Sequence, residues 1–306
     1  MSEKYLVVGA GPVGTELSQL LAERGAEVTV VTRSGGRSSG SVTRVAADAS
    51  DPDRLSELAV GARALFNCAN PPDYTQWATV WPPLAESLLV AAERSDAPLV
   101  MTGNLYPYGP VDEPMVEGQP DRATDEKGRL RAGIWAEALR RHEAGRIRAV
   151  EVRGSDYVGP GVGGNGHLSR HVPTARRGKS AWAVGRPNLP HTWTDVGDMA
   201  RTLAAVAGRE DTWGQVWHAP SNEPRTQQQG LTDVLAADGL PPVPVRGIPD
   251  PVLAAMGVFS PLIRQLREMS YMFRRPYVMS STHTQAVLGL APTPWAEVCH
   301  RTVTGN

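Results

Sequence analysis

The chain has 306 residues, and its 31 basic and 32 acidic side chains give a formal net charge of −1. This balance gives no electrostatic reason to expect nucleic acid or an anionic membrane as a partner, and no apolar run approaches the ~20 residues of a membrane-spanning helix. Two cysteines exclude a disulfide scaffold, and residues 1–11 lack the pattern of a signal peptide, so we expect a cytoplasmic protein.

The first predicted elements are two apolar strands with a helix between them. Residues 5–9 and 27–31 form short apolar runs, which are typical of buried parallel strands. Residues 15–25 carry leucines at helical spacing and end in a glycine, a common C-terminal stop for a helix. A strand, a turn, a helix and a strand within about thirty residues are the setting of a dinucleotide-binding motif.

The turn after the first strand carries this motif as Gly9-x-Gly11-x-x-Gly14. Gly9 permits the tight turn, Gly11 lets the backbone approach a pyrophosphate, and Gly14 lets the helix pack closely on the strand. Pro12 and Val13 complete the turn, where exposed N–H groups and the helix dipole favour phosphate. The alternative is a glycine turn that binds no ligand.

The end of the second strand indicates which dinucleotide is preferred. NAD sites place Asp or Glu there to accept hydrogen bonds from the ribose 2′-OH, whereas this chain has Thr32. Arg33, Ser34 and Arg37 follow, and guanidinium groups can bind a 2′-phosphate. The missing acid is the stronger argument, because nearly all basic residues of this chain are arginine. We therefore expect NADP (NADPH) as the cofactor, with NAD less favoured.

Two further strands, at 42–49 and 64–70, and a helix at 53–58 complete the first seventy residues. In doubly wound folds ligands bind outside the carboxyl ends of the strands, so the ends of these two strands are expected to contact the cofactor. The candidate residues are Asp48, Ala49 and Ala69.

Later segments follow in a recognisable order. A strand at 98–109 ends in a Tyr-Gly pair, and a strand and turn at 153–161 end in Gly-Pro-Gly. The segments 191–200 and 288–294 come after them. Together with the glycine turn, this order resembles the short-chain dehydrogenase/reductase superfamily, in its extended branch of nucleotide-sugar epimerases and dehydratases.

The resemblance implies an α/β fold, namely a Rossmann-type doubly wound parallel sheet with a smaller C-terminal substrate lobe. It implies that residues 1–160 and 191–220 form the dinucleotide-binding domain, and that 161–190 and 221–306 form the substrate-binding lobe. It also implies a small-molecule substrate between the lobes and homodimerisation.

The chain departs from the family at the catalytic dyad. The family's general acid or base is a Tyr with a Lys four residues later, and no Tyr-x-x-x-Lys occurs in this sequence. Alignment on Glu137 places Arg129 at the Tyr position and Gly133 at the Lys position. Lys127 is expected in a solvated loop. Arg129 and Arg131 either hold the cofactor or only cover a helix surface.

Three residues near the end of strand 98–109 are the catalytic candidates. Asn104 takes the position of the family's substrate-binding Ser or Thr and can polarise a carbonyl by hydrogen bonding. Tyr106 is the expected proton donor, and Tyr108 is a second candidate, although this tyrosine is more often structural. His167 and His191 either touch the substrate or are solvated or capping residues. No metal site is predicted, because the histidines are not at ligand spacing from one another or from carboxylates.

Two apolar patterns allow more than one interpretation. Trp77 and Trp81, at i and i+4, are expected in the core rather than on a cleft rim. The predicted helical region 251–272 has an apolar face that either lines a lipophilic substrate pocket or packs the lobes together. Its members are Met256, Phe259, Leu262, Ile263, Leu266, Met269 and Met272.

These patterns predict an NADP-dependent oxidoreductase that moves hydride between nicotinamide and a carbonyl or alcohol of a small molecule. One alternative is an epimerase or dehydratase that regenerates its cofactor internally. Another is a dinucleotide sensor without catalytic activity.

Overall fold

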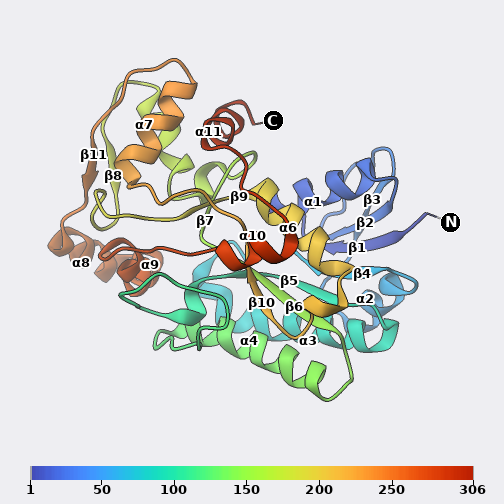
Figure 1. The fold of residues 1–306 in the computed structure, drawn as a ribbon. Coiled ribbons are helices and arrows are strands. Elements are labelled where there is room, and N and C mark those ends of the chain that lie inside the picture. The colour runs from blue at the N-terminus through green and yellow to red at the C-terminus, as the bar shows by residue number, and fades with distance from the viewer. Residues whose placement is uncertain (1, 306) are drawn as a thin grey trace.

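A seven-stranded parallel sheet forms the centre of the larger lobe (Figure 1). The computed structural model describes residues 2–305, except for the side chains of residues 256, 259, 261, 262 and 266. The strand order is β10-β6-β5-β4-β1-β2-β3, which is the order of dinucleotide-binding folds with β10 added at one edge. The strands are β1 Lys4–Val8, β2 Glu27–Thr32, β3 Val42–Ala46, β4 Ala64–Asn67, β5 Leu99–Asn104, β6 Ala149–Gly154 and β10 Val216–His218.

Helices cover both faces of this sheet, as right-handed crossovers between parallel strands require. Successive residues of β1 face opposite sides, so that Leu6 and Val8 lie in one apolar core and Val7 lies in the other. The core around Leu6 is completed by α2 Pro52–Ala59, α3 Trp77–Ser95 and α4 Glu126–Glu143, and the core around Val7 by α1 Pro12–Glu23 and α6 Val196–Ala207. The two tryptophans of α3 are 3% and 0% exposed, which confirms that they belong to the core.

The smaller lobe has a third apolar core (Figure 1). In it β8 (Ala181–Ala183) pairs with β11 (Val245–Gly247), and nearby β7 (Asp156–Val158) pairs with β9 (Trp193–Asp195). The remaining helices are α5 Val172–Ala175, α7 Gln227–Ala237, α8 Asp250–Phe259, α9 Pro261–Glu268, α10 Thr282–Leu288 and α11 Trp295–Thr304. Six short 3-10 helices join these elements: η1 Tyr74–Gln76, η2 Tyr106–Tyr108, η3 Gly163–Asn165, η4 Ser169–His171, η5 Glu210–Thr212 and η6 Met269–Phe273.

The predicted helical region 251–272 is divided into separate helices. Ser260 ends α8 and caps α9, because its hydroxyl accepts a hydrogen bond from the N–H of Ile263. A proline follows Ser260, and a proline disfavours helical geometry at the residue before it.

Within residues 2–305, no helix combines the length and the apolar character that crossing a membrane requires.

Candidate active site

The glycine turn has the geometry that a dinucleotide site requires. Gly9 has φ +102°, and a Cβ there would lie 2.7 Å from the N of Ala69. A Cβ on Gly14 would overlap the carbonyl oxygen of Gly9, whereas a Cβ on Gly11 would meet nothing within 4 Å. The first and third glycines are thus needed for packing, and the second leaves open space above the N-terminus of α1. Among the described residues no side chain caps α1, so its first N–H groups are available to phosphate oxygens.

The turn after β2 carries the residues expected to select the cofactor. The Thr32 hydroxyl donates to the carbonyl of Gly35 at 2.7 Å, which closes the turn. Arg33, Ser34 and Arg37 are exposed on it, and within residues 2–305 neither arginine is within ion-pair distance of a carboxylate.

The end of β4 lies beside the glycine turn, and the end of β3 lies at the edge of the sheet next to β2. The Asp48 carboxylate is exposed and accepts hydrogen bonds from the N–H and hydroxyl of Ser50, which lower its pKa. Ala49 is partly buried. Ala69 packs under Gly9, and its N–H donates to the side-chain oxygen of Asn67 at 3.2 Å. The end of β4 therefore lies beside the glycine turn that opens α1.

The catalytic candidates of β5 and η2 occupy different environments. The Asn104 side-chain oxygen accepts a hydrogen bond from the N–H of Tyr106 at 3.2 Å. Tyr106 is 8% exposed, stacks on Trp77, and shares a 2.8 Å hydrogen bond with the hydroxyl of Tyr74. Burial raises the pKa of both tyrosines, so both hydroxyls keep their protons at neutral pH.

Tyr108 is held inside the protein. It is 1% exposed, and its hydroxyl lies 2.7 Å from Nε2 of His218, whose Nδ1 lies 2.7 Å from the carbonyl oxygen of Ser280. The guanidinium of Arg153 lies over its ring at 4.6 Å. These contacts indicate a structural role for Tyr108, which is not among the residues that line the cleft described below.

Helix α4 corrects the expectation for Lys127. Lys127 is wrongly predicted as a solvated loop residue, because it lies in the first turn of α4 and is 1% exposed. Arg129 and Gly133 are exposed, whereas Arg131, four residues after Lys127, is 3% exposed. Lys127 and Arg131 therefore lie one turn apart on the buried side of α4, and Arg141 is a further buried cation of this helix.

Lys127 and Arg131 have partners from distant parts of the chain. Lys127 Nζ contacts Gln265 Oε1 and lies 2.7 Å from a carboxylate oxygen of Glu268. Arg131 donates to the carbonyl of Thr102 at 2.7 Å and lies over the ring of Trp81. The Nε of Arg131 has no partner among the described residues, so this guanidinium retains an unused donor.

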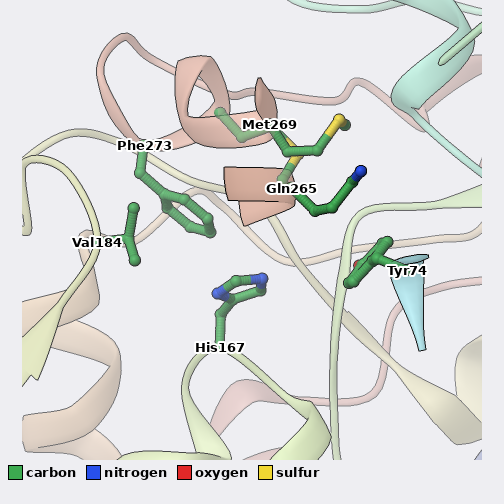
Figure 2. A pocket seen from close by; sticks show the side chains of 7 residues that line it. Tyr74, His167, Val184, Gln265, Met269 and Phe273 are labelled. Atoms are coloured by element: carbon green, nitrogen blue, oxygen red, sulfur yellow. The ribbon is translucent and has the colours of Figure 1, made fainter. Parts of the chain in front are cut away.

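A cleft lies where η1, the loop after β7 and the η6 region meet, as Figure 2 shows. Tyr74 and His167 both line it, and the ring of Phe273 lies tilted at 48° to that of His167, with 4.5 Å between the ring centroids. His191 is 2% exposed, which corrects the expectation of a solvated residue, and its Nε2 lies 2.8 Å from a carboxylate oxygen of Asp156. Met269 and Met272 line the cleft, whereas the side chains of Met256, Phe259, Leu262 and Leu266 lie outside the described residues.

Sequence reasoning missed Tyr74, Asp156 and the start of α4. One local signal was present for α4, since Asp125 is the N-cap and its carboxylate accepts a hydrogen bond from the N–H of Gly128. Asp156 follows β6 by two residues, which places it at the carboxyl edge of the sheet.

The buried His218 leads to a testable dependence of stability on pH. Burial lowers the pKa of His218 below its unfolded value of about 6.5, so below pH 6.5 the unfolded chain binds a proton that the folded chain does not. This histidine therefore reduces the free energy of unfolding as the pH falls. We expect a smaller decrease between pH 6.5 and 4.5 in His218→Asn than in the unchanged protein, measured by urea denaturation. The exposed His300→Gln variant should keep the original dependence, and an unchanged slope in His218→Asn would contradict the argument.

The fold and the site together define a class of protein. A parallel sheet of this order, an open glycine turn at β1 and a cleft near the carboxyl ends of the strands are features of dinucleotide-dependent enzymes of the extended short-chain dehydrogenase/reductase type. Residues 5–217 match the NAD dependent epimerase/dehydratase family, and the chain belongs to this family. The predicted fold, family and enzymatic character are thereby confirmed.

Individual relatives are distant. The chain is 28% identical over 213 residues to a dTDP-6-deoxy-L-talose 4-dehydrogenase (NAD(P)(+)) of Kitasatospora kifunensis. The aligned residues are 65% of this chain and 66% of that protein. The fold is similar to MoeE5 in complex with UDP-glucose and NAD, with a TM-score of 0.80, 19% identity, and coverage of 99% of this chain and 98% of the other. A dTDP-glucose 4,6-dehydratase of Bacillus anthracis str. Ames in complex with NAD gives a TM-score of 0.80 at 15% identity, with coverage of 99% and 96%.

Proposed function

We propose that the protein is an NADP-dependent oxidoreductase acting on a carbonyl or alcohol of a small molecule. The observation that carries this proposal is the end of β2, where Thr32 replaces an acid and Arg33 and Arg37 are exposed. The proposal includes the division into a dinucleotide domain (1–160 and 191–220) and a substrate lobe (161–190 and 221–306). Homodimerisation and a cytoplasmic location stay predictions.

The residues present fit a bound dinucleotide. Gly11 leaves space for the pyrophosphate above α1, and Ala69 packs against Gly9 beside it. We place Asp48 and Ala49, which follow β3, near the adenine ring. Arg131 has a free Nε donor that suits a ribose hydroxyl at the edge of β5. A bound nicotinamide supplies the hydride chemistry.

The chain itself must supply or remove the proton. We place this role on Tyr106, whose hydroxyl is bonded to the hydroxyl of Tyr74, a residue that lines the cleft. In the direction of carbonyl reduction a neutral tyrosine can donate its proton, and the raised pKa keeps Tyr106 neutral. The amide of Asn104, whose oxygen is already bonded to the N–H of Tyr106, has N–H donors with which to orient a carbonyl.

The cofactor preference is tested by calorimetric titration with NADPH and NADH. We expect NADPH to bind more tightly, and Arg33→Ala/Arg37→Ala to weaken NADPH binding roughly 10- to 100-fold with little change for NADH, because charged hydrogen bonds to the 2′-phosphate are lost. Arg24→Ala is the matched control, since Arg24 is also exposed but follows the C-terminus of α1. Equal affinities for both dinucleotides would overturn the preference for NADP and leave the fold assignment intact.

A second function is favoured by the family itself, whose description includes epimerases and dehydratases. Such an enzyme would regenerate its cofactor within each turnover. Conversion of substrate without net consumption of NADPH, followed by absorbance of the reduced cofactor, would select this second function over the first.

A further inference from the structure

The proposed proton donor Tyr106 is almost fully covered in this structure. It is 8% exposed, and its hydroxyl bonds to that of Tyr74 at 2.8 Å. Tyr74 borders the cleft of Figure 2 and a second space beside Thr75 and Lys127, and each has room for about one or two water molecules. Through these two spaces, a small-molecule substrate can reach the Tyr74–Tyr106 pair only after a neighbouring segment has moved.

The segment 250–274, which contains α8, α9 and η6, provides most of the lining of the cleft. Figure 2 shows three of its side chains above His167, and one of them also lines the second space. Of the seven residues that line the cleft, four belong to this segment, namely Gln265, Met269, Met272 and Phe273. Movement of this segment would therefore open the cleft.

The two ends of the segment lie close together. Arg274 is 2.8 Å from a carboxylate oxygen of Asp250, the first residue of α8. Between the two ends, Ser260 separates α8 from α9 with an extended backbone, at φ −128° and ψ 111°. Hinges are a few loop or element-terminal residues, so a segment with neighbouring ends can swing as one unit.

Glu268, at the end of α9, holds the segment to the start of α4. One of its carboxylate oxygens lies 2.7 Å from Lys127 Nζ, and the other accepts a hydrogen bond from the N–H of Glu126 at 2.6 Å. Gln265 Oε1 contacts the same ammonium. The side chain of Lys127 is 2% exposed and that of Glu268 is 29% exposed, so water can reach the carboxylate as the two separate. We call these contacts of Glu268 and Gln265 with α4 the latch.

A buried hydroxyl next to the segment lacks a partner among the described residues. This hydroxyl belongs to Tyr277, which is 3% exposed. The imidazole of His191 stacks on the ring of Tyr277 and on that of Phe273, at 5.2 and 5.0 Å between centroids. Burial of an unpaired hydroxyl costs free energy, which a bound polar group would recover. The arrangement in this structure therefore leaves a polar group for a ligand to bind.

We propose that residues 250–274 form a lid over the Tyr74–Tyr106 pair, and that the latch must break before a substrate enters. The arrangement described above is the closed one. The proposal rests on the proposed function, because a reaction at Tyr106 is what requires a substrate there. When closed, the lid keeps bulk water away from the proton donor.

Amide hydrogen exchange of the whole protein, without cofactor or substrate, tests the latch. Glu268→Gln removes the charge that pairs with Lys127, so the lid should open more often and the amides of residues 250–274 should exchange roughly tenfold faster. The amides of β1 and β5 should exchange as in the unchanged protein. Glu86→Gln is the matched control, because Glu86 pairs at 2.7 Å with Arg141, a buried cation near the other end of α4. It should leave exchange in residues 250–274 unchanged.

Access to the cleft is measured separately with Met269→Cys, which places a thiol on the lining. Met269 is 3% exposed, so DTNB should react with this thiol only when the lid opens, and roughly tenfold faster when Glu268→Gln is added. Cys68 and Cys299 are buried, and their reaction is measured in the protein without the Met269 substitution and subtracted. Because DTNB is itself a small molecule, its reaction rate reports the access that a substrate needs.

Equal exchange rates in Glu268→Gln and Glu86→Gln would overturn the lid, as would a Met269→Cys thiol whose reaction with DTNB does not depend on Glu268. Faster exchange in β1 and β5 as well as in residues 250–274 would also overturn it, since Glu268 would then stabilise the whole fold. Failure of NADPH to bind in calorimetry would instead overturn the proposed function, because both lid measurements are made without cofactor.

Discussion

Replacing Tyr106 with phenylalanine is expected to lower kcat about 10²- to 10⁴-fold, which is the usual contribution of a positioned proton donor. The ring stays in its stack on Trp77, while the 2.8 Å hydrogen bond to Tyr74 is lost. The Kd for NADPH should not change, because the hydroxyl that is removed is bonded to Tyr74 and not to the glycine turn. Tyr74→Phe should give a similar loss of turnover, since it breaks the same hydroxyl pair.

The measurement is steady-state turnover with NADPH and a carbonyl substrate identified by screening, together with calorimetric titration of NADPH. Tyr5→Phe is the matched control, because its hydroxyl is bonded to Glu3 beside the first residues of β1, at the far end of the sheet from the cleft. Full turnover in Tyr106→Phe would remove this tyrosine from the mechanism. A loss of NADPH affinity in the same variant would show that the substitution acts through the cofactor site instead.

Replacing Glu151 with alanine is expected to reduce the free energy of unfolding by about 3–5 kcal/mol, the usual cost of breaking a buried ion pair. Glu151 and Arg153 are each 1% exposed, and a carboxylate oxygen of Glu151 lies 2.8 Å from Nε of Arg153. Arg131 lies 4.0 Å from the same carboxylate. Without the Glu151 carboxylate, the guanidinium groups of Arg131 and Arg153 would stay buried. Of the two, only Arg153 would retain an ion pair, the one with Asp121.

Urea denaturation provides the measurement, with Glu57→Ala as the control. Glu57 pairs with Arg54 at 2.8 Å, but the two side chains are 67% and 45% exposed, so we expect a change of less than about 1 kcal/mol. Glu151→Gln keeps hydrogen-bonding atoms in place and should be less destabilised than Glu151→Ala. Similar values for Glu151→Ala and Glu57→Ala would contradict the assignment of Glu151 as a structural counter-ion.

Much of the nucleotide-binding half was predictable because its signals are local. Buried parallel strands are short apolar runs, and the three glycines of the first turn stand at fixed spacing between a strand and a helix. The turn after β2 was predictable in the same way, because it directly follows an apolar strand in the sequence. These elements need only neighbouring residues to be recognised.

The surroundings of the catalytic candidates could not be predicted in this way, because they depend on contacts between distant parts of the chain. The burial of Lys127 requires Glu268, which is 141 residues away, and a sequence pattern around Lys127 contains no trace of that partner. The pairing of Tyr74 with Tyr106 likewise joins residues 32 positions apart on different elements. Periodicity identifies which side chains share a helix face, but not which distant group lies opposite them.

The position of β10 at the sheet edge has a consequence for how the protein is made. Strand β6 pairs with β10, with hydrogen bonds from Glu151 N to Gln215 O and from Ala219 N to Arg153 O. During synthesis, β6 therefore leaves the ribosome long before its neighbour exists, and its edge stays unpaired while the intervening segment is translated. A fragment that stops after the first predicted domain segment would carry this open edge permanently, and exposed edges promote aggregation. The central sheet is thus completed only after residues 161–190 and the segment up to β10 have been made.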